Sequence, residues 1–273
     1  ILISLSSDKI YCLFNRNYLA MTAKIIDGKA IAEQNLNKLK QEILERENND
    51  IRRPCLAVIL VGDDPASSIY VNKKKSACEN VGIKSVSHQL PTDTNQSNLN
   101  DLINTLNQDE DVDGILVQSP LPKHLDEELI IELISPNKDV DGFHPMNVGN
   151  LSYGYESSVP CTPLGCYLMI KKIEPNLNGK KAVMVGRSNL NGKPMTQLLL
   201  KENCTVTITH SKTKDLKTEC LRADIIIAAV GIAKLVKARL IVFIELEFLT
   251  IIRASDHLDS GFSCLNLLIS FAI

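Results

Sequence analysis

Hydrophobic residues along the chain alternate between short apolar runs and longer stretches in which they recur at helical intervals. Cys55–Val61 is apolar at every position, which is typical of a parallel strand buried on both faces. Residues 28–47 instead space Ile31, Leu36 and Ile43 among polar residues, as an amphipathic helix does. The two patterns predict further strands at 83–90, 114–118, 181–186, 204–209 and 224–230, and helices at about 97–107, 126–134, 163–173, 192–202 and 213–222. Repeated strand–helix units predict an α/β fold with parallel sheets and helices on both faces.

The alternation is interrupted once, which predicts two domains. Residues 135–160 are loop-rich and lack the strand–helix pattern. We therefore expect one α/β domain over residues 22–160 and a second over 161–241, with a cleft between them. Residues 1–21 and 242–273 do not follow the pattern and are expected to be atypical ends.

The two ends differ from the middle in composition as well. The first 20 residues show neither a helical nor a strand period, and Met21 is expected to be the natural start. All prolines lie at or before Pro194, and Gly261 is the single glycine after Gly231. This C-terminal stretch is consistent with a buried pair of helices, or with a truncated or frame-shifted gene product.

Composition narrows the class of protein. The 273 residues are 44% apolar and carry a net charge of −2, which allows a sizeable core and argues against a nucleic-acid groove or a polybasic membrane patch. No apolar run reaches about 18 residues, so no transmembrane helix is predicted. None of the 8 cysteines forms a C-x-x-C pair, so we expect neither a disulfide scaffold nor a metal site, and a reducing compartment.

The second domain carries a candidate phosphate-binding turn. The strand 181–186 runs through Gly186, Arg187 and Ser188 to Gly192, where a helix is predicted. A glycine-rich turn before a helix lets the backbone approach a phosphate, and the helix N-terminus favours its negative charge. Because Ser188 stands where the second glycine of G-x-G-x-x-G would be, an ordinary tight turn remains an alternative.

The residues after the next strand bear on the choice of cofactor. NAD sites usually place an acidic residue about 20 residues beyond the glycine turn, where it binds the ribose. Here the strand 204–209 ends in His210, Ser211 and Lys212 instead. Together with Arg187, Ser211 and Lys212 could accept a 2′-phosphate, which favours NADP over NAD. A solvated loop is the alternative reading of these residues.

The first domain carries candidate catalytic residues on one helix. Asp64 and Pro65 predict the start of this helix and Gly82 its end. Tyr70 and Lys74 are four residues apart and therefore share a face. Two further lysines flank Lys74, and like charges and partial burial lower the pKa of a lysine, which suits proton transfer. The alternative is a solvated lysine face.

Two more polar positions lie where an α/β sheet binds ligands. Gln118 ends a predicted strand, and the carboxyl ends of strands form the ligand sites of open α/β sheets. Asp139 and Asp141 lie in the loop toward the domain boundary, where they are either ligand-binding carboxylates or a pair of turn-forming residues.

Six motifs occur in the order of one known family. The motifs are Tyr70–Lys74 (YVNKK), Gly114–Pro122 (GILVQSPLP), Lys138–Pro145 (KDVDGFHP), Pro160–Gly165 (PCTPLG), Gly186–Asn189 (GRSN) and His210–Thr213 (HSKT). With this set, the chain resembles the bifunctional methylenetetrahydrofolate dehydrogenase/cyclohydrolase (FolD) family of bacteria and mitochondria from about residue 23 to residue 241.

The resemblance implies a catalytic folate-binding domain followed by a Rossmann-like NAD(P)-binding domain. It implies oxidation of 5,10-methylenetetrahydrofolate with NADP⁺, and hydrolysis of the methenyl product to 10-formyltetrahydrofolate. It also implies the following roles: catalysis by Lys74, Tyr70 and Gln118; binding of the tetrahydrofolate derivative by Tyr70, Lys74, Val117, Gln118, Ser119 and Asp141; and binding of the cofactor phosphates by Gly186, Arg187, Ser188 and Ser211, with no metal.

The sequence departs from the family pattern in places. Ser119 stands where leucine is usual and Asn191 where valine is usual. Beyond Ile241 the family continues with Asp-Val-Gly-Ile and a Pro-Gly-Gly loop, which this sequence lacks. One alternative is therefore a catalytically impaired, truncated member that keeps the fold and binds nucleotide. A weaker alternative is another two-domain NADP dehydrogenase resembling shikimate dehydrogenase.

The resemblance also suggests the protein's surroundings. Family members are usually homodimers that act in one-carbon metabolism, which supplies purine and amino-acid biosynthesis. We therefore expect a homodimer without nucleic-acid or membrane partners. The expected compartment is the bacterial cytoplasm, with the mitochondrial matrix as the alternative.

Overall fold

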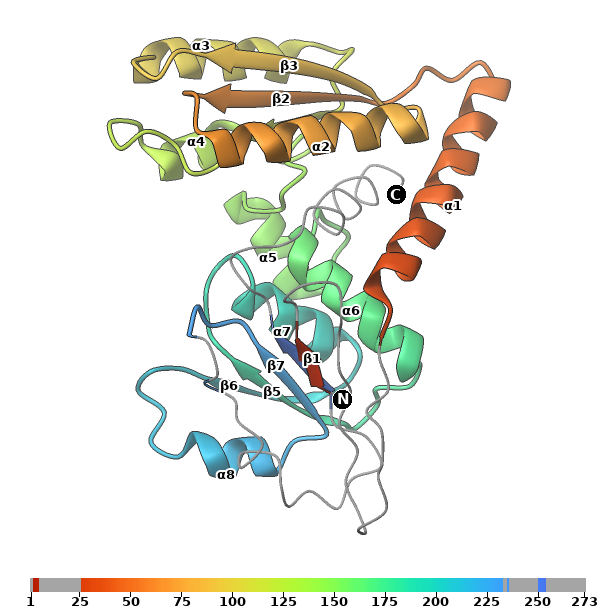
Figure 1. The fold of residues 1–273 in the computed structure, drawn as a ribbon, viewed down its shortest axis with the longest axis vertical. Coiled ribbons are helices and arrows are strands. Elements are labelled where there is room, and N and C mark those ends of the chain that lie inside the picture. Colours follow the sequence, from red (N-terminus) through yellow and green to blue (C-terminus); the bar gives the residue numbers. More distant parts are fainter. Residues whose placement is uncertain (1, 5–25, 233–234, 236–249, 254–273) are drawn as a thin grey trace. The chain divides into compact units, whose positions relative to one another are not determined.

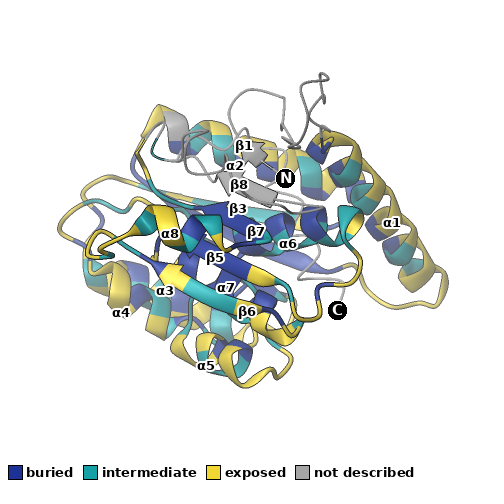
Figure 2. Ribbon diagram, turned by 90° about the horizontal axis from the view of Figure 1, so that it is seen from below, coloured by how far each residue is buried: buried dark blue, intermediate teal, exposed yellow. Residues whose placement is uncertain are grey.

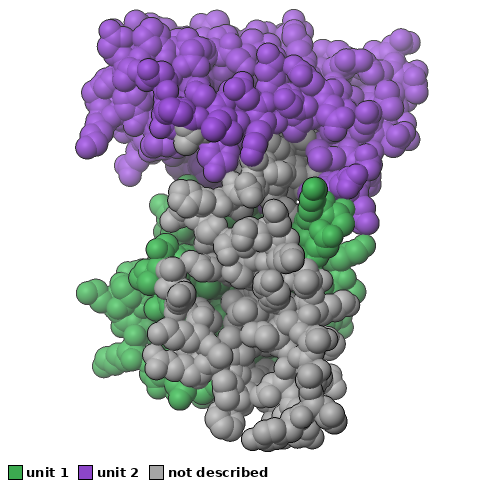
Figure 3. All heavy atoms as spheres, in the orientation of Figure 1, with its two compact units in different colours: residues 1–31, 162–262 green, residues 32–161, 263–273 purple. Residues whose placement is uncertain are grey.

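The computed structural model describes residues 2–4, 26–232, 235 and 250–253. They fall into two compact units, coloured separately in Figure 3. Unit 2 contains residues 32–161, and unit 1 contains residues 26–31 together with the described residues from Thr162 onward and the strand at residues 2–4. Met21 and the tail at 254–273 lie outside the described residues.

Unit 2 is built on a three-stranded parallel sheet in the order β3-β2-β4. Its strands are β2 (Cys55–Val61), β3 (Lys84–Leu90) and β4 (Gly114–Val117). Of these three strands, β2 comes first in the sequence and lies in the middle of the sheet. Between β3 and β4 the chain crosses from one edge of the sheet to the other. This change of direction creates a switch point between the carboxyl ends of β2 and β4, which is where open α/β sheets bind ligands.

Helices cover both faces of this sheet. On one face lie α1 (Gly28–Asn48) and α2 (Pro65–Val81), and on the other lie α3 (Gln96–Gln108) and α4 (Glu127–Leu133). Figure 1 shows α2 and α3 on opposite sides of β2 and β3. Because side chains alternate along a strand, Leu56 and Val58 pack toward α1 and α2, whereas Ala57 and Ile59 pack toward α3 and α4.

The described residues of unit 1 form a parallel sheet of five strands in the order β1-β8-β7-β5-β6. They are β1 (Leu2–Ser4), β5 (Lys181–Val185), β6 (Thr205–Thr209), β7 (Ile225–Ala228) and β8 (Thr250–Arg253). One face packs against α6 (Cys161–Ile173) and α7 (Gly192–Lys201), and the other against α8 (Leu216–Leu221). Figure 2 shows β5 and β7 mostly buried, while α8 exposes much of its surface. The predicted α/β fold with parallel sheets and helices on both faces is confirmed.

The structure differs from the sequence prediction in three places. The loop-rich stretch 135–160 contains a further helix, α5 (Pro145–Tyr153), which begins after His144. Two strands that the sequence did not predict, β1 and β8, pair with each other in unit 1. Ile26 packs in the core of unit 1. Residues 26–31 therefore belong to that unit, whereas the sequence prediction placed them in the domain over 22–160.

Four cysteines help to form the hydrophobic cores. Cys55, Cys166, Cys204 and Cys220 are buried free thiols. Each belongs to a hydrophobic core, where a thiol behaves as a small apolar group.

Within the described part of the chain, no helix combines the length and the apolar character needed to cross a bilayer.

Candidate active site

Lys74 is the one buried lysine in the run of three on α2. Lys73 and Lys75 are exposed, whereas Lys74 is 8% exposed. Its Nζ donates a hydrogen bond to Gln118 Oε1 at 3.1 Å. Tyr70 lies one helical turn before Lys74 and is partly buried. The solvated-face interpretation therefore applies to Lys73 and Lys75 but is wrong for Lys74.

Gln118 directly follows β4, and both the oxygen and the nitrogen of its side-chain amide form hydrogen bonds. Its backbone N–H donates to Ile59 O at 2.9 Å, which fixes it beside the end of β2 at the switch point of the sheet. Its Nε2 donates to Ser119 O at 2.7 Å, and its Oε1 accepts from Lys74. The Ser119 carbonyl thereby turns the amide so that its oxygen, and not its NH₂ group, faces the lysine.

The two aspartates of the Lys138–Pro145 motif have different surroundings. Asp139 is buried and accepts from Gly142 N at 3.0 Å, His144 N at 2.9 Å and Asn147 Nδ2 at 2.9 Å. It therefore has the turn-forming role. No hydrogen bond to the Asp141 carboxylate is recorded within the described residues. Burial raises the pKa of Asp141 to about 6; the positive charge of Lys74 opposes this rise and Asp139 adds to it.

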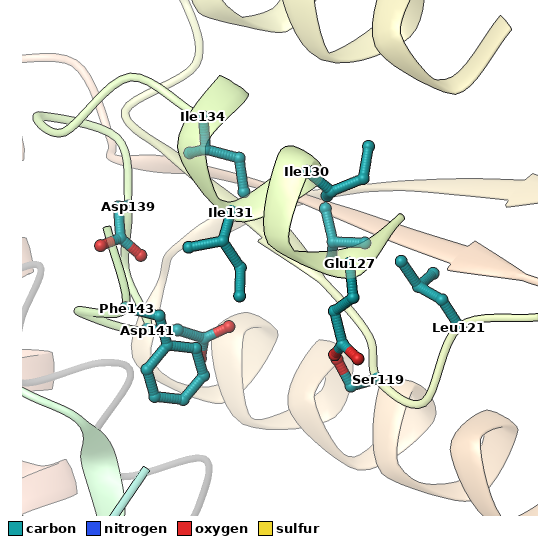
Figure 4. A pocket seen from close by; sticks show the side chains of 10 residues that line it. Ser119, Leu121, Glu127, Ile130, Ile131, Ile134, Asp139, Asp141 and Phe143 are labelled. Atoms are coloured by element: carbon teal, nitrogen blue, oxygen red, sulfur yellow. The ribbon is translucent and has the colours of Figure 1, made fainter. Parts of the chain in front are cut away.

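A small pocket connects Asp141 with the end of β4. Figure 4 shows its lining side chains, with Ile131 projecting from α4, Ile134 from the residue that directly follows this helix, and the carboxylate of Glu127 pointing at Ser119. The pocket contains three residues that the sequence assigned to substrate binding, Val117, Ser119 and Asp141, but not Tyr70, Lys74 or Gln118. Its full lining is Val117, Ser119, Leu121, Glu127, Ile130, Ile131, Ile134, Asp139, Asp141 and Phe143.

Two residues of the pocket, Glu127 and Phe143, were not predicted from the sequence. Phe143 lies inside the motif that contains both aspartates, so its position was a usable signal. The sequence around Glu127 offered no such signal, because an acidic residue in the first turn of a helix is common. Its approach to Ser119 depends on how α4 packs, through the buried Ile130, on the sheet.

An Asp141→Asn variant is expected to be more stable than the parent protein at neutral pH. The unfolded carboxyl titrates near 3.8 and the folded one near 6. The folded state therefore binds more protons between these values, and the free energy of unfolding falls as the pH rises through this window. Asparagine has no proton to lose, so the variant should gain about 1–3 kcal/mol at pH 7.

Urea unfolding between about pH 4 and pH 8 measures this difference, with the exposed Asp101→Asn as the control. Parallel pH profiles for the parent and Asp141→Asn would contradict the assignment of this titration to Asp141.

In unit 1, Gly186 lies at the carboxyl end of β5, between its two neighbouring strands. Its N–H donates to Thr209 O at 2.9 Å, and its φ of +119° lies in the region that favours glycine. A Cβ at this position would lie 2.4 Å from Ala229 O. One at Gly192 would lie 2.5 Å from Gly186 O. Both glycines are thus required for a close turn of the backbone before α7.

The remaining predicted phosphate ligands surround this turn. Ser188 Oγ accepts from Asn191 N at 3.2 Å and from Gly192 N at 3.4 Å, in front of α7. Arg187 and Ser211 are exposed. A backbone that only glycine can form, placed before the N-terminus of a ten-residue helix, fits a nucleotide phosphate. No acidic side chain follows the end of β6 before Asp215.

Two family models together match most of the chain. The description of the first is "Tetrahydrofolate dehydrogenase/cyclohydrolase, catalytic domain", and it matches residues 26–141. The second describes the NAD(P)-binding domain of the same family and matches residues 160–243. The chain belongs to the tetrahydrofolate dehydrogenase/cyclohydrolase family. Membership confirms the resemblance drawn from the six motifs and argues against a protein resembling shikimate dehydrogenase.

Individual members of the tetrahydrofolate dehydrogenase/cyclohydrolase family support the assignment. The bifunctional protein FolD of Pelagibacter ubique is 65% identical over 214 residues, which are 78% of this chain and 76% of the relative. FolD of Phenylobacterium zucineum is 52% identical over 217 residues, 80% of this chain and 73% of that relative. The crystal structure of FolD from Campylobacter jejuni has a TM-score of 0.82 at 38% identity and covers 90% of this chain and 96% of its own.

A further solved structure is the FolD of Trypanosoma brucei complexed with NADP cofactor and an inhibitor. It has a TM-score of 0.77 at 26% identity and covers 89% of this chain and 94% of its own.

Proposed function

We propose that this protein oxidises 5,10-methylenetetrahydrofolate to the methenyl form with NADP⁺ and hydrolyses the methenyl form to 10-formyltetrahydrofolate. The observation that carries the proposal is the buried Lys74 amine bonded to Gln118 within the region that matches the catalytic domain. An enclosed amine beside a ligand-binding switch point is suited to proton transfer.

Hydrolysis of the methenyl bridge needs a group that takes a proton from the attacking water. In this proposal Lys74 fills that role and Gln118 holds its amine in place. Tyr70 stacks on the pterin ring, and Asp141 binds polar groups of the ring. Val117 and Ser119 line the pocket next to them.

The oxidation step depends mainly on positioning. NADP⁺, when bound, supplies the nicotinamide that accepts the hydride. In this proposal Gly186, Arg187, Ser188 and Ser211 hold the cofactor phosphates, with Arg187 and Ser211 at the 2′-phosphate. The close approach that Gly186 permits supports this role.

The preference for NADP over NAD makes a separate prediction. Arg187→Ala is expected to weaken NADP⁺ binding about 10-fold to 100-fold, because a charged hydrogen bond to the 2′-phosphate is lost. Binding of NAD⁺ should change less than twofold, since it has no such phosphate. Calorimetric titration with both nucleotides measures the effect, and the exposed Lys201→Ala is the control. Equal losses for the two cofactors would contradict a 2′-phosphate contact.

The proposal extends to assembly and location. We expect a homodimer, from the family resemblance, and a role in the one-carbon supply to purine and amino-acid biosynthesis. The curated relatives above are bacterial proteins, which supports the cytoplasm over a mitochondrial matrix. Sedimentation of the purified protein tests the dimer.

A direct assay tests the activities. Purified full-length chain is supplied with methylenetetrahydrofolate and NADP⁺, and the absorbance of methenyltetrahydrofolate is followed. Hydrolysis is measured separately from the decay of added methenyltetrahydrofolate. Turnover in both assays supports the proposal. A folded protein that binds NADP⁺ but turns over neither substrate would favour a catalytically impaired member of the family.

A further inference from the structure

A chain of hydrogen bonds leads from α4 to the candidate catalytic lysine. The Ser119 hydroxyl donates to Glu127 Oε1, and the Ser119 carbonyl accepts from Gln118 Nε2 at 2.7 Å. Gln118 Oε1 in turn accepts from Lys74 Nζ at 3.1 Å. Each residue therefore fixes the orientation of the next.

The link from Ser119 to Glu127 lies in a loop with few backbone donors. Ser119 is followed by Pro120, Leu121 and Pro122, and the two prolines have no N–H to donate to neighbouring backbone. The hydrogen bond from the Ser119 side chain therefore adds to the anchoring of this loop. Figure 4 shows Glu127 reaching from the first turn of α4 to Ser119, beside the pocket that Asp141 also lines.

The helix that carries Glu127 is itself fixed. The Asp126 carboxylate accepts from Leu129 N at 3.1 Å, and Asp126 N donates to Gln96 Oε1 at 2.8 Å. Ile130 is 1% exposed in the core of unit 2. The backbone that carries Glu127 is thus held on the sheet, and its side chain offers a hydrogen-bond acceptor to the Ser119 loop.

We infer that Glu127, acting through Ser119, is a positioning residue that holds the Gln118 amide in the orientation that Lys74 requires for hydrolysis. This inference rests on the proposed function. A released Ser119 carbonyl would let the Gln118 amide turn over, and its NH₂ group would then face the lysine amine. The family pattern has leucine at position 119, so this link is a feature of this chain's own serine.

Two alanine variants test the inference. Ser119→Ala and Glu127→Ala should each lower kcat for hydrolysis about fivefold to tenfold, since both side chains are exposed and water competes for their hydrogen bond. In Glu127→Ala the KM for methenyltetrahydrofolate should stay within about twofold, and in both variants the pH profile of kcat should shift. The double variant should lose no more than either single one, because both break the same link.

Controls separate positioning from a general effect of the substitution. Glu128→Ala removes a neighbouring exposed carboxylate from the same turn and should leave hydrolysis unchanged. Ser119→Thr keeps the hydroxyl and should restore kcat. Parent values of kcat and an unshifted pH profile in both alanine variants would overturn the inference.

Crystal structures of the unliganded variants provide a readout that does not depend on activity. In the parent and in Ser119→Thr, the Gln118 amide should be ordered against Lys74. In Ser119→Ala and Glu127→Ala, it should be displaced or adopt two conformations. An unchanged Gln118 in both alanine variants would overturn the inference. Absence of turnover in the parent protein would instead count against the proposed function and leave this structural test intact.

Discussion

Replacement of Lys74 by alanine is expected to lower the rate of methenyltetrahydrofolate hydrolysis about 10²-fold to 10⁴-fold, the range for a lost general acid–base group. The amine is 8% exposed and bonded to Gln118, so no neighbouring lysine can take its place without moving α2. NADP⁺ binding should be unchanged, because the glycine turn belongs to unit 1 and Lys74 to unit 2. Single-turnover hydrolysis and calorimetric NADP⁺ titration measure the two quantities.

The flanking lysines provide matched controls on the same helix. Lys73→Ala and Lys75→Ala remove the same charge from exposed positions and should retain hydrolysis within about twofold. Hydrolysis that survives in Lys74→Ala, or that falls equally in all three variants, would refute a specific role for this amine.

Replacement of Gly186 by alanine is expected to abolish measurable NADP⁺ binding and to destabilise unit 1 by about 3 kcal/mol or more. The new Cβ would lie 2.4 Å from Ala229 O, a backbone atom of the residue that directly follows β7 and whose own N–H donates to Val185 O at 2.9 Å. Even where the Gly186→Ala variant folds, the turn between β5 and α7 would be altered. Its backbone N–H groups would then no longer point at a bound phosphate. Thermal unfolding followed by circular dichroism, together with NADP⁺ titration, measures both effects.

Gly179 isolates the steric part of this prediction. It also has a positive φ, +72°, but an added Cβ would meet nothing within 4 Å. Gly179→Ala should therefore cost only the backbone strain of about 1 kcal/mol and leave NADP⁺ binding intact. Similar losses in the two variants would mean that backbone strain, and not the close approach at Gly186, determines the effect.

Short-range patterns predicted most of the regular structure. Cys55–Val61 is β2 with the predicted bounds, and Asp64 and Gly82 cap α2 as predicted. These elements depend on residues close together in the chain. The helix α5 was missed because loop-forming residues surround it, although His144 followed by Pro145 is a helix-start signal.

The candidate site was predictable only in part, for a physical reason. Composition could not separate Asp139 from Asp141, because the difference lies in three hydrogen bonds that only the folded loop supplies. Likewise, Lys74 was distinguished from Lys73 and Lys75 by its contact with Gln118, 44 residues away. Residue types identified the chemistry, whereas its geometry required the tertiary fold.

Where the described chain passes from one unit to the other, it is helical. The boundary falls between Ile31 and Ala32, within the first turns of α1, and again between Cys161 and Thr162, at the first residues of α6. Domain boundaries more often fall in flexible, glycine-rich or proline-rich segments. Each of these two crossings is therefore made by helical backbone, whose hydrogen bonds continue from one unit into the next. A flexible peptide spliced in at either of these two places would interrupt a helix while leaving both sheets intact.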